Sequence, residues 1–442
     1  MAEHERRVVI TGLGLLTPLG IGSEPYLHGL REGLAGIHEL SEFPVEGLSS
    51  KAAAAVPPFD IRTLAQPNHR TVIRKNLKYM ARDIQLAVAG AELAMADAGL
   101  SEGGVDPTRI GLDLGAGLIS TDLDELAPAI NHSLKGDEPF DFAAWGKEGI
   151  PMITPIWLLK YLPNMLACHI SIFWDCQGPS NSITEAESAS TLAMGESLRI
   201  LRRGRADVMI TGGADSKIHP LSLVRMTLLN QLTRWPGNAS EACRPFDRDR
   251  DGWVPGEGAG IVLFEEMSHA KNRGAKIYGE VLGFGAGTDA NPAGGIDPDG
   301  RGIEIAVRAA LRDAGLEPHQ IGHVNAQGAA HPAMDLAEAR AYKRVFGAHG
   351  VPVTGLKGFI GNTVSGSGAI EMAGSLLSVN AGFIPMTRNC SHPDASLELD
   401  VVTQSGRKAS NPIFMKTTLT RHGQAAALVI RGYPSGVASD AV

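Results

Sequence analysis

Short runs of consecutive apolar residues alternate along the chain with longer segments of helical periodicity. The stretch "RRVVITGLGLL" (residues 6–16) predicts a buried strand that ends in a glycine turn. The segment "ARDIQLAVAGAELAMADAGL" (81–100) has apolar residues at helical spacing and stops at Ala98-Gly99-Leu100. After it, "RIGLDLGAG" (109–117) predicts another strand and glycine turn. The pattern therefore predicts an α/β protein.

This helix–loop–strand unit occurs a second time. In "GIEIAVRAALRDAGLEPHQIGHVNAQG" (302–328) a helix, a short loop, Ile-Gly and a strand recur in the same order. Asp97-Ala98-Gly99-Leu100 matches Asp313-Ala314-Gly315-Leu316, which predicts a duplicated α/β half. We expect the halves at residues 6–260 and 261–433. The first carries an insertion at about 119–165, which could cap the core or line a partner surface, and residues 434–442 are expected to form a disordered tail.

Composition narrows the class of protein. The chain has 442 residues, 43% of them apolar, with 53 glycines and few aromatics, which suits a large α/β core. The net charge of −8 and the absence of a basic block argue against nucleic acid as a partner. The sequence contains no apolar span of 18 residues, so no membrane helix is predicted, and the N-terminus lacks the apolar core of a signal peptide. The four cysteines show no metal-ligand spacing, so we expect a cytoplasmic protein with reduced thiols and no metal or other cofactor.

A candidate chemical site lies in "SITEAESAS" (182–190), between Gly178-Pro179-Ser180 and a helical run. The local pattern predicts a strand, a sharp turn and a helix, an arrangement in which enzymes often place a nucleophile. A cysteine or serine would be expected at the turn. The chain has Glu187 there instead.

Five segments together resemble one family along residues 6 to 431. They are "RRVVITGLGLLTPLG" (6–20), "GPSNSITEAESAS" (178–190), "RPFDRDRDGWVPGEGAG" (244–260), "VNAQGAAHPAMDLAEA" (324–339) and "LKGFIGNTVSGSGAIE" (356–371). In this register the chain resembles the elongating, KAS II-type β-ketoacyl-acyl-carrier-protein synthases of the thiolase superfamily. The resemblance implies the thiolase fold, with duplicated halves in a five-layer αβαβα sandwich. It also implies a dimer formed across the strand at about Asn181 to Thr184.

The resemblance also implies three catalytic positions, and this chain has lost the family residue at each. Glu187 replaces the cysteine that carries the acyl chain as a thioester. Gln327 and Asn362 replace the two histidines that bind the extender carbonyl and stabilise the enolate. Lys357 is retained from the family's functional set, together with Asp335 and Glu338.

Two neighbouring motifs differ as well. The Thr-Ser-Thr that contacts the carrier's pantetheine arm in the family reads Ala329-Ala330-His331 here. The family's apolar Phe-Gly-Phe-Gly-Gly gate reads Leu419 to Gly423 and includes Arg421 and His422. A charged segment therefore occupies the position of a glycine-hinged apolar gate.

Glu187 has two interpretations. The first is a carboxylate anchored in a site that has lost its chemistry, paired with Lys357, Arg421 or His422 and with its pKa below the ordinary value of about 4.3. In that case Glu187→Gln should destabilise the protein by roughly 1–3 kcal/mol. The second is new chemistry, in which an unpaired carboxyl with a raised pKa acts as acid or base with His422 or His331. A solvent-connected cavity at Glu187 would favour it.

The amides and the retained charges have simpler interpretations. Gln327 and Asn362 can hydrogen-bond an oxyanion, but we expect them to fill the space of the lost imidazoles. For Lys357 we expect an internal ion pair with Glu338 and Asp335.

The main hypothesis is a non-condensing subunit of polyketide or fatty-acid biosynthesis that resembles a chain-length factor. Its expected partners are an active ketosynthase or a second copy, through an interface of order 2,000 Å², and an acyl carrier protein. Chain-length factors commonly have glutamine where this chain has Glu187, which leaves open a separate group of homodimeric pseudo-ketosynthases. The alternative is a divergent enzyme that uses Glu187 as acid or base on an acyl thioester. The triple loss argues against a condensing enzyme.

Overall fold

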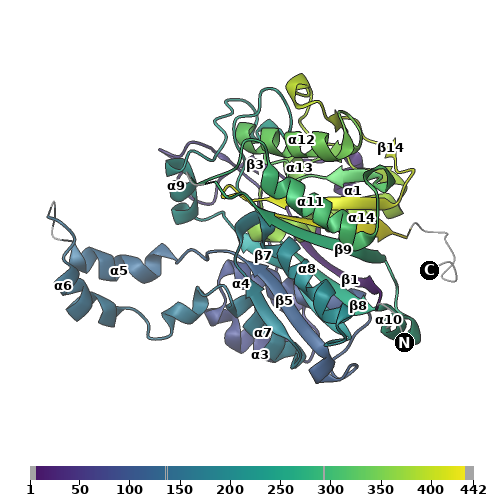
Figure 1. The fold of residues 1–442 in the computed structure, drawn as a ribbon. Helices are drawn as coiled ribbons and strands as arrows, with labels where there is room; N and C mark the ends of the chain where they lie inside the picture. Colours follow the sequence, from purple (N-terminus) through teal and green to yellow (C-terminus); the bar gives the residue numbers. More distant parts are fainter. Residues whose placement is uncertain (1–5, 135, 137, 292–293, 434–442) are drawn as a thin grey trace.

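Two halves of the same topology make up the body of the molecule (Figure 1). The computed structural model describes residues 6–134, 136, 138–291 and 294–433, so the tail predicted at 434–442 lies outside the described residues. In the first half the core elements are β1 (Val8–Thr17), α4 (Arg82–Asp97), β5 (Ile110–Ala116), β6 (Ser180–Ile183), α8 (Ala189–Arg202), β7 (Val208–Ser216) and β8 (Glu257–Glu266). In the second they are β9 (Gly279–Thr288), α11 (Arg301–Ala314), β10 (His323–Asn325), β11 (Pro352–Thr354), α14 (Ser367–Asn380), β15 (Ile413–Leu419) and β16 (Gln424–Gly432).

The strand orders of the two halves correspond. The first half has the order β6-β5-β7-β8-β1, and the second has β11-β10-β15-β16-β9. β5 in the first half and β10 in the second each pair in parallel with both neighbours. The other pairs within these two orders are antiparallel. β1 and β9 pair antiparallel at the centre, so the two sheets join along a pseudo-twofold axis. The duplication predicted from residues 97–100 and 313–316 is confirmed.

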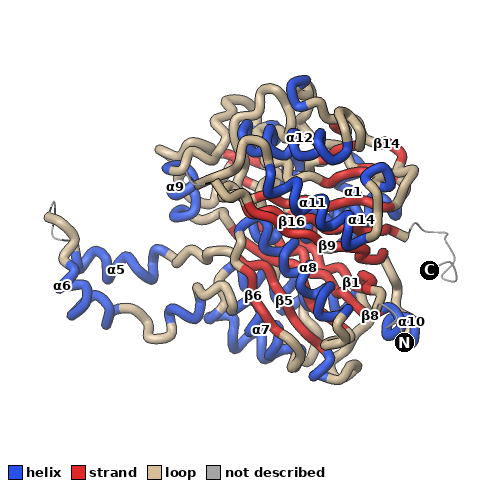
Figure 2. The backbone as a smooth tube through the Cα atoms, viewed as in Figure 1, coloured by secondary structure: helices blue, strands red, loops and turns tan. Residues whose placement is uncertain are grey.

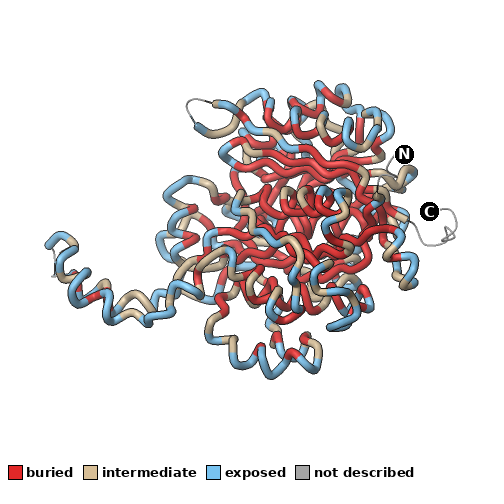
Figure 3. The backbone as a smooth tube through the Cα atoms, turned by 60° about the horizontal axis from the view of Figure 1, so that its bottom comes forward, coloured by how far each residue is buried: buried red, intermediate tan, exposed pale blue. Residues whose placement is uncertain are grey.

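Helices and sheets alternate in five layers (Figure 2). α4 covers the outer face of the first sheet, and α11 covers the outer face of the second. α8 and α14 pack against each other between the sheets, where their apolar residues form a buried cluster. Figure 3 shows that the strands of both sheets are buried along most of their length. The predicted thiolase fold, an αβαβα sandwich, is therefore confirmed.

The duplicated halves share one close approach of backbone to backbone. A Cβ atom on Gly14 of β1 would lie 1.8 Å from the carbonyl oxygen of Gly90 on α4. A Cβ atom on Gly285 of β9 would lie 2.1 Å from the carbonyl oxygen of Ala306 on α11. Since no side chain fits at such distances, both strands need glycine where the outer helix crosses them.

The remaining helices and strands of the body lie in the connections between these elements. They are α1 (Ser23–Glu32), α2 (Ile61–Leu64), α3 (Arg70–Asn76), α7 (Met165–Trp174), α9 (Pro220–Leu228), α10 (Met267–Asn272), α12 (Pro332–Phe346), α13 (Lys357–Ile360), β2 (Gly20–Ile21), β3 (His38–Glu39), β4 (Ala52–Ala53), β12 (Phe383–Ile384), β13 (Asp400–Val401) and β14 (Arg407–Lys408). β8 runs across the boundary expected at residue 260. We infer that the first half ends after β8, because a cut at 260 would divide that strand.

The insertion forms an arm that extends away from the body (Figure 1). Between residues 119 and 165 it contains α5 (Leu123–Ser133), α6 (Phe142–Ala144) and short turns of π- and 3-10 helix at Trp145–Gly149, Ile150–Met152 and Trp157–Lys160. Many of its apolar side chains are exposed, Phe142 to 79%. Of the two roles expected for the insertion, an arm with exposed apolar side chains fits a partner surface better than a cap. No described helix has the length and apolarity needed to cross a membrane.

Candidate functional site

Glu187 lies in a sharp turn between the edge strand β6 and the central helix α8. The turn is a single 3-10 helix, Ala186–Ser188, and Ala186 has a φ of 42° in the left-handed region. α8 begins directly after it at Ala189. The strand, turn and helix predicted from the sequence are confirmed. Glu187 is only 2% exposed at the start of α8, so its carboxyl is held in the protein interior.

A second turn of the same kind faces this one from the other half. The 3-10 helix Val364–Gly366 precedes α14, and Val364 has a φ of 41°. Asn362 lies just before that turn, and its side-chain N–H donates to Glu187 Oε1 at 3.1 Å. Asn362 Oδ1 in turn accepts the backbone N–H of Val364 at 3.1 Å. The hydrogen bond between Glu187 and Asn362 therefore links the corresponding turns of the two halves.

The expected ion pair of Glu187 is wrong. Among the described residues no Lys, Arg or His lies within salt-bridge distance of its carboxyl. Burial raises the pKa of Glu187. Three effects oppose that rise without cancelling it: a hydrogen bond from its own backbone N–H, one from Asn362, and the charge of Lys357. Lys357 has another partner, and Arg421 and His422 are exposed. The interior stabilises the protonated carboxyl relative to the carboxylate.

Lys357 belongs to a buried cluster of three charged residues centred on Glu371 of α14. Lys357 Nζ lies 2.6 Å from Glu371 Oε1, and Lys416 of β15 pairs with Oε2 of the same carboxylate. All three side chains are fully buried. Burial lowers the pKa of Lys416 to about 8, and the charge of Lys357 adds to the effect. The expected pairing of Lys357 with Glu338 and Asp335 is therefore wrong, since Glu371 holds two cations at once.

Glu338 and Asp335 stabilise backbone instead. Glu338 accepts the backbone N–H groups of Gln327 and Gly328 at 2.7 and 3.0 Å. Asp335 accepts the N–H of Phe246 at 3.0 Å and lies 3.5 Å from the Arg250 guanidinium. Burial raises the pKa of Asp335 to about 7. Both acids lie on α12, so this helix fixes the loop that follows β10.

That loop positions Gln327. Lys357 Nζ donates to its carbonyl oxygen at 2.9 Å, and Glu338 accepts its N–H. Its side-chain nitrogen and oxygen are buried and have no hydrogen-bond partner among the described residues. Glu187, Asn362 and Gln327 are thus all buried, a hydrogen bond joins the first two, and none of the three is a thiol or an imidazole.

A pocket of about 490 Å³ opens onto Glu187. Its walls come from the base of the arm, the β6–α8 turn, α9 and the β15–β16 turn. The lining residues are Gly117, Leu118, Pro163, Thr184, Ala186, Glu187, Lys217, Ser222, Arg225, Met226, Leu229, Gln231, Trp253, Val364, Arg421 and His422. The expected neighbours Arg421 and His422 therefore share a pocket with Glu187, whereas His331 does not line it and lies at the start of α12 near Arg250.

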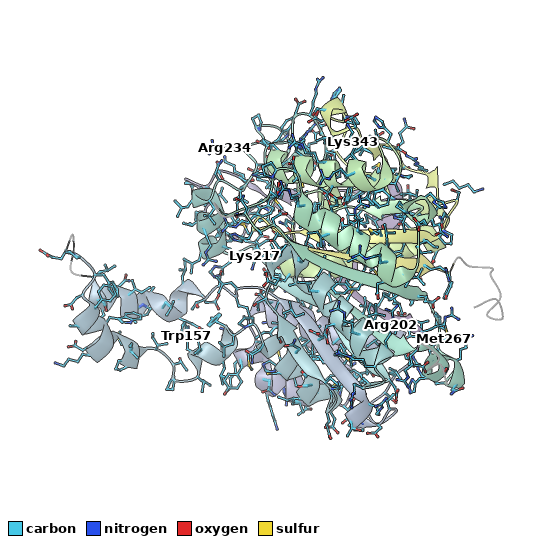
Figure 4. All side chains as sticks on the ribbon, viewed as in Figure 1. Trp157, Arg202, Lys217, Arg234, Met267 and Lys343 are labelled. Atoms are coloured by element: carbon cyan, nitrogen blue, oxygen red, sulfur yellow. The ribbon has the colours of Figure 1, made fainter. Side chains whose placement is uncertain are left out.

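Lys217 marks the point where the arm and α9 meet the body (Figure 4). Its Nζ lies 2.5 Å from Asp215 Oδ1 and donates to the carbonyl oxygen of Leu118 at 3.1 Å. Asp215 also accepts the N–H of Ser365 at 3.2 Å. Lys217 and Asp215 therefore neutralise each other within the pocket wall.

The sequence interpretation missed Glu371, Lys416 and the pocket residues of α9. A usable signal existed for the first two, since each is a lone charge in an apolar run, "SGAIEMAGSLL" (367–377) and "IFMKTTL" (413–419). An isolated charge in a buried element requires a buried counter-charge. Arg225 has no such signal, because its place in the pocket depends on how α9 packs.

The chain matches two family models: "Beta-ketoacyl synthase, N-terminal domain" over residues 5–270 and "Beta-ketoacyl synthase, C-terminal domain" over 278–391. The 3-oxoacyl-acyl-carrier-protein synthase 2 of Vibrio cholerae serotype O1 is 33% identical over 410 residues, which cover 92% of this chain and 94% of that protein. The mitochondrial 3-oxoacyl-acyl-carrier-protein synthase of Arabidopsis thaliana is 35% identical over 419 residues, covering 89% and 86%.

Solved structures agree with these sequence relatives. The ishigamide ketosynthase/chain length factor is 29% identical, with a TM-score of 0.83. A β-ketoacyl synthase from Burkholderia phymatum STM815 is 27% identical, with a TM-score of 0.84. A type II polyketide synthase acyl-carrier protein in complex with its ketosynthase contains a chain that is 27% identical, with a TM-score of 0.82. Each comparison covers 97% of this chain and 100% of the other.

Proposed function

This chain belongs to the β-ketoacyl synthase family, and we propose that it is a non-condensing, chain-length-factor-like subunit that works beside an active ketosynthase. The single observation that carries the proposal is the buried Glu187, hydrogen-bonded to Asn362 at 3.1 Å in the turn where the family has its nucleophile. The family works in fatty-acid and polyketide biosynthesis, and this subunit would serve the same assembly without forming the carbon–carbon bond.

The residues of the site argue against condensation. Acyl transfer to Glu187 would give a mixed anhydride, which hydrolyses more readily than a thioester. Asn362 already donates to this carboxyl, and Gln327 supplies an amide where the reaction needs an imidazole. Amides do not exchange protons near neutral pH as histidine does. Neither acyl storage nor enolate formation has a competent residue here.

Two features of the first half support association with another subunit. β6 is the edge strand of its sheet, and edge strands expose backbone donors and acceptors that pair readily with another chain. Asp113 of β5 is in register with Asn181 of β6, and both of its buried carboxylate oxygens lack a hydrogen-bond partner among the described residues. Burial raises the pKa of Asp113 to about 7. Since Asp113 is fully buried on an interior strand, its carboxylate belongs to the sheet interior, and the β6 edge itself supports association.

Exposed apolar side chains lie on three elements of the first half, and one of these, α7, packs against β6. Ile172 on α7 is 67% exposed, Phe142 on the arm 79%, and Leu228 on α9 80%. Exposed apolar surface is typical of a protein interface, and Ile172 lies on the helix that packs beside the unpaired strand edge. Related solved structures contain a chain-length factor and a carrier protein, which supports an active ketosynthase as the partner and an acyl carrier protein as a transient one.

Co-expression with a ketosynthase that keeps the cysteine and both histidines tests the proposal. We expect a stable complex in equal amounts by affinity purification and light scattering. Ile172→Asp should abolish it, because a charge would be buried beside the β6 edge. Leu34→Asp is the matched control, since Leu34 is also an exposed apolar residue but follows α1 in another part of the body. If the chain formed only a homodimer and bound none of the ketosynthases tested, the heteromeric role would be contradicted.

Glu187→Cys alone is expected to restore no measurable condensation. The variant places a thiol at the start of α8, but Gln327 and Asn362 still occupy the histidine positions, and residues that act as a unit give strongly non-additive effects. The assay measures product formation from acyl-carrier protein and malonyl-carrier protein. Intact-mass spectrometry is applied to both the wild type and the variant. The wild type should show no acyl shift. Turnover by the single variant would mean that the amides can replace the imidazoles.

A second candidate function rests on the pocket at Glu187. The pocket gives the carboxyl access to a ligand, and burial raises its pKa toward the range of a general acid or base. Glu187 would then act on an acyl thioester or a related substrate. Hydrolysis of a panel of acyl thioesters that is lost in Glu187→Gln, in the absence of any ketosynthase, would favour this enzyme over the non-condensing subunit.

A further inference from the structure

The pocket over Glu187 carries more positive than negative charge. Arg225 of α9 and Arg421 of the β15–β16 turn both line it, and neither guanidinium has an ion pair or hydrogen bond within the described part of the chain. Lys217 is matched by Asp215 at 2.5 Å. Glu187 also lines this pocket, and burial raises its pKa, which weakens its carboxylate as a counter-charge for the arginines.

This excess is local. The whole chain has a formal net charge of −8, so two unpaired arginines in one pocket run against its general balance. His422 lies beside Arg421 in the same wall. Cations from separate elements that converge on one concavity raise the local concentration of an anion. A neutral acyl group placed in this pocket would leave both guanidiniums without a counter-ion.

Apolar side chains form another part of the wall, beside the polar residues Thr184, Ser222 and Gln231. Leu118, Met226, Leu229, Trp253 and Val364 contribute side chains from four separate segments. A volume of about 490 Å³ falls within the usual range for small-molecule pockets. The pocket therefore suits an amphipathic ligand, with an aliphatic body against these side chains and a single anionic group at the arginines.

We propose that the pocket binds an acyl chain that ends in a free carboxylate, with the carboxylate held by Arg225 and Arg421. The planar guanidinium presents paired N–H donors that match the two oxygens of a carboxylate. Burial raises the pKa of Glu187, which reduces the repulsion between its carboxyl and such a ligand. This inference goes beyond the proposed function, because it concerns the chain by itself and requires no partner.

Isothermal titration calorimetry of the full chain with decanoate tests the inference. Decan-1-ol and the decanoyl thioester of N-acetylcysteamine provide the same chain without charge, and decyl phosphate provides a different anion. We expect decanoate to bind at least about tenfold more tightly than either neutral probe, and Arg421→Ala and Arg225→Ala each to weaken decanoate about tenfold while leaving the neutral probes unchanged. Arg74→Ala on α3, an exposed arginine outside the pocket, should have no effect.

Several results would overturn it. They are equal affinity for decanoate and a neutral probe, tighter binding of decyl phosphate than of decanoate, or unchanged decanoate affinity in both pocket variants. Thermal melting of each variant checks that it is folded. Co-purification of the same variants with a ketosynthase separates the two ideas, since loss of carboxylate binding with an intact complex rejects this inference alone.

Discussion

Replacing Glu371 by glutamine is expected to destabilise the folded chain by about 3–5 kcal/mol, because it leaves two buried ammonium groups without their anion. Lys357 and Lys416 both contact this carboxylate, and all three side chains are fully buried. Glutamine has nearly the same volume, so packing changes little and the loss reports on charge. Urea unfolding at pH 7 measures it.

The pH dependence of the same variant follows from Lys416. Burial lowers its pKa from 10.5 to about 8, so the native protein releases this proton at lower pH than the unfolded chain does. Its contribution to stability therefore rises between about pH 8 and 10.5. Without Glu371 the buried ammonium of Lys416 is less favourable still. The difference in stability between the variant and the wild type should therefore shrink as the pH rises above 7.

Glu304→Gln is the matched control. Glu304 on α11 also contacts two cations, Arg308 and Arg344, but at the surface. Exposed pairs of this kind contribute about 0–1 kcal/mol, so the control should cost far less. A Glu371→Gln variant no less stable than this control would mean that the buried cluster is not ionised.

The sequence predicted the architecture because the fold repeats itself. Asp97 and Asp313 lie in the last turns of equivalent helices, and the glycines at positions 14 and 285 meet those helices at the same point of each half. The turn at Glu187 was also predictable, since Gly178-Pro179-Ser180 followed by a helical run is a local signal for a strand, a sharp turn and a helix. These features depend on residues that are close in the sequence or on a unit that recurs.

The pairing of buried charges was not predictable in the same way. Glu338, Asp335 and Glu371 were all available to Lys357, and which acid it meets depends on how α12, α13 and α14 pack. The arm was predicted as an insertion, but its extension from the body depends on contacts at its base, such as Lys217 with Leu118. Arg421 was predicted near Glu187 and shares its pocket, yet it is exposed and forms no ion pair with that carboxyl.

Glu187→Gln is expected to leave the protein as stable as the wild type or more stable at pH 8, the reverse of the loss expected from a paired carboxylate. Asn362 donates to Oε1, and the amide oxygen of glutamine can accept the same hydrogen bond. The variant removes only the cost of ionising a buried acid. The structure changes the sign of this prediction because no Lys, Arg or His in the described part of the chain pairs with Glu187.

The pH profile distinguishes the two cases. An acid with a raised pKa binds its proton more tightly in the native state, so stability falls as the pH rises from the ordinary value of 4.5 through the folded pKa. Each unit of rise costs about 1.4 kcal/mol once the carboxyl is ionised. The stability advantage of Glu187→Gln should therefore grow with pH over that interval, which denaturant unfolding between pH 4.5 and 8 can follow.

Glu265→Gln should behave in the opposite way. Burial alone would raise the pKa of Glu265, but hydrogen bonds from Arg273, Thr11 and His269 outweigh it, and the pKa is lowered. The Glu265 carboxylate stabilises the folded protein above the ordinary pKa of 4.5, and this stabilisation is lost as the pH falls through the folded pKa. Replacing Glu265 should therefore destabilise the protein at pH 7. If Glu187→Gln also destabilised the protein at pH 7, with a loss that disappears in acid, Glu187 would be an ionised and paired carboxylate, and the pocket would lose the excess of positive charge inferred above.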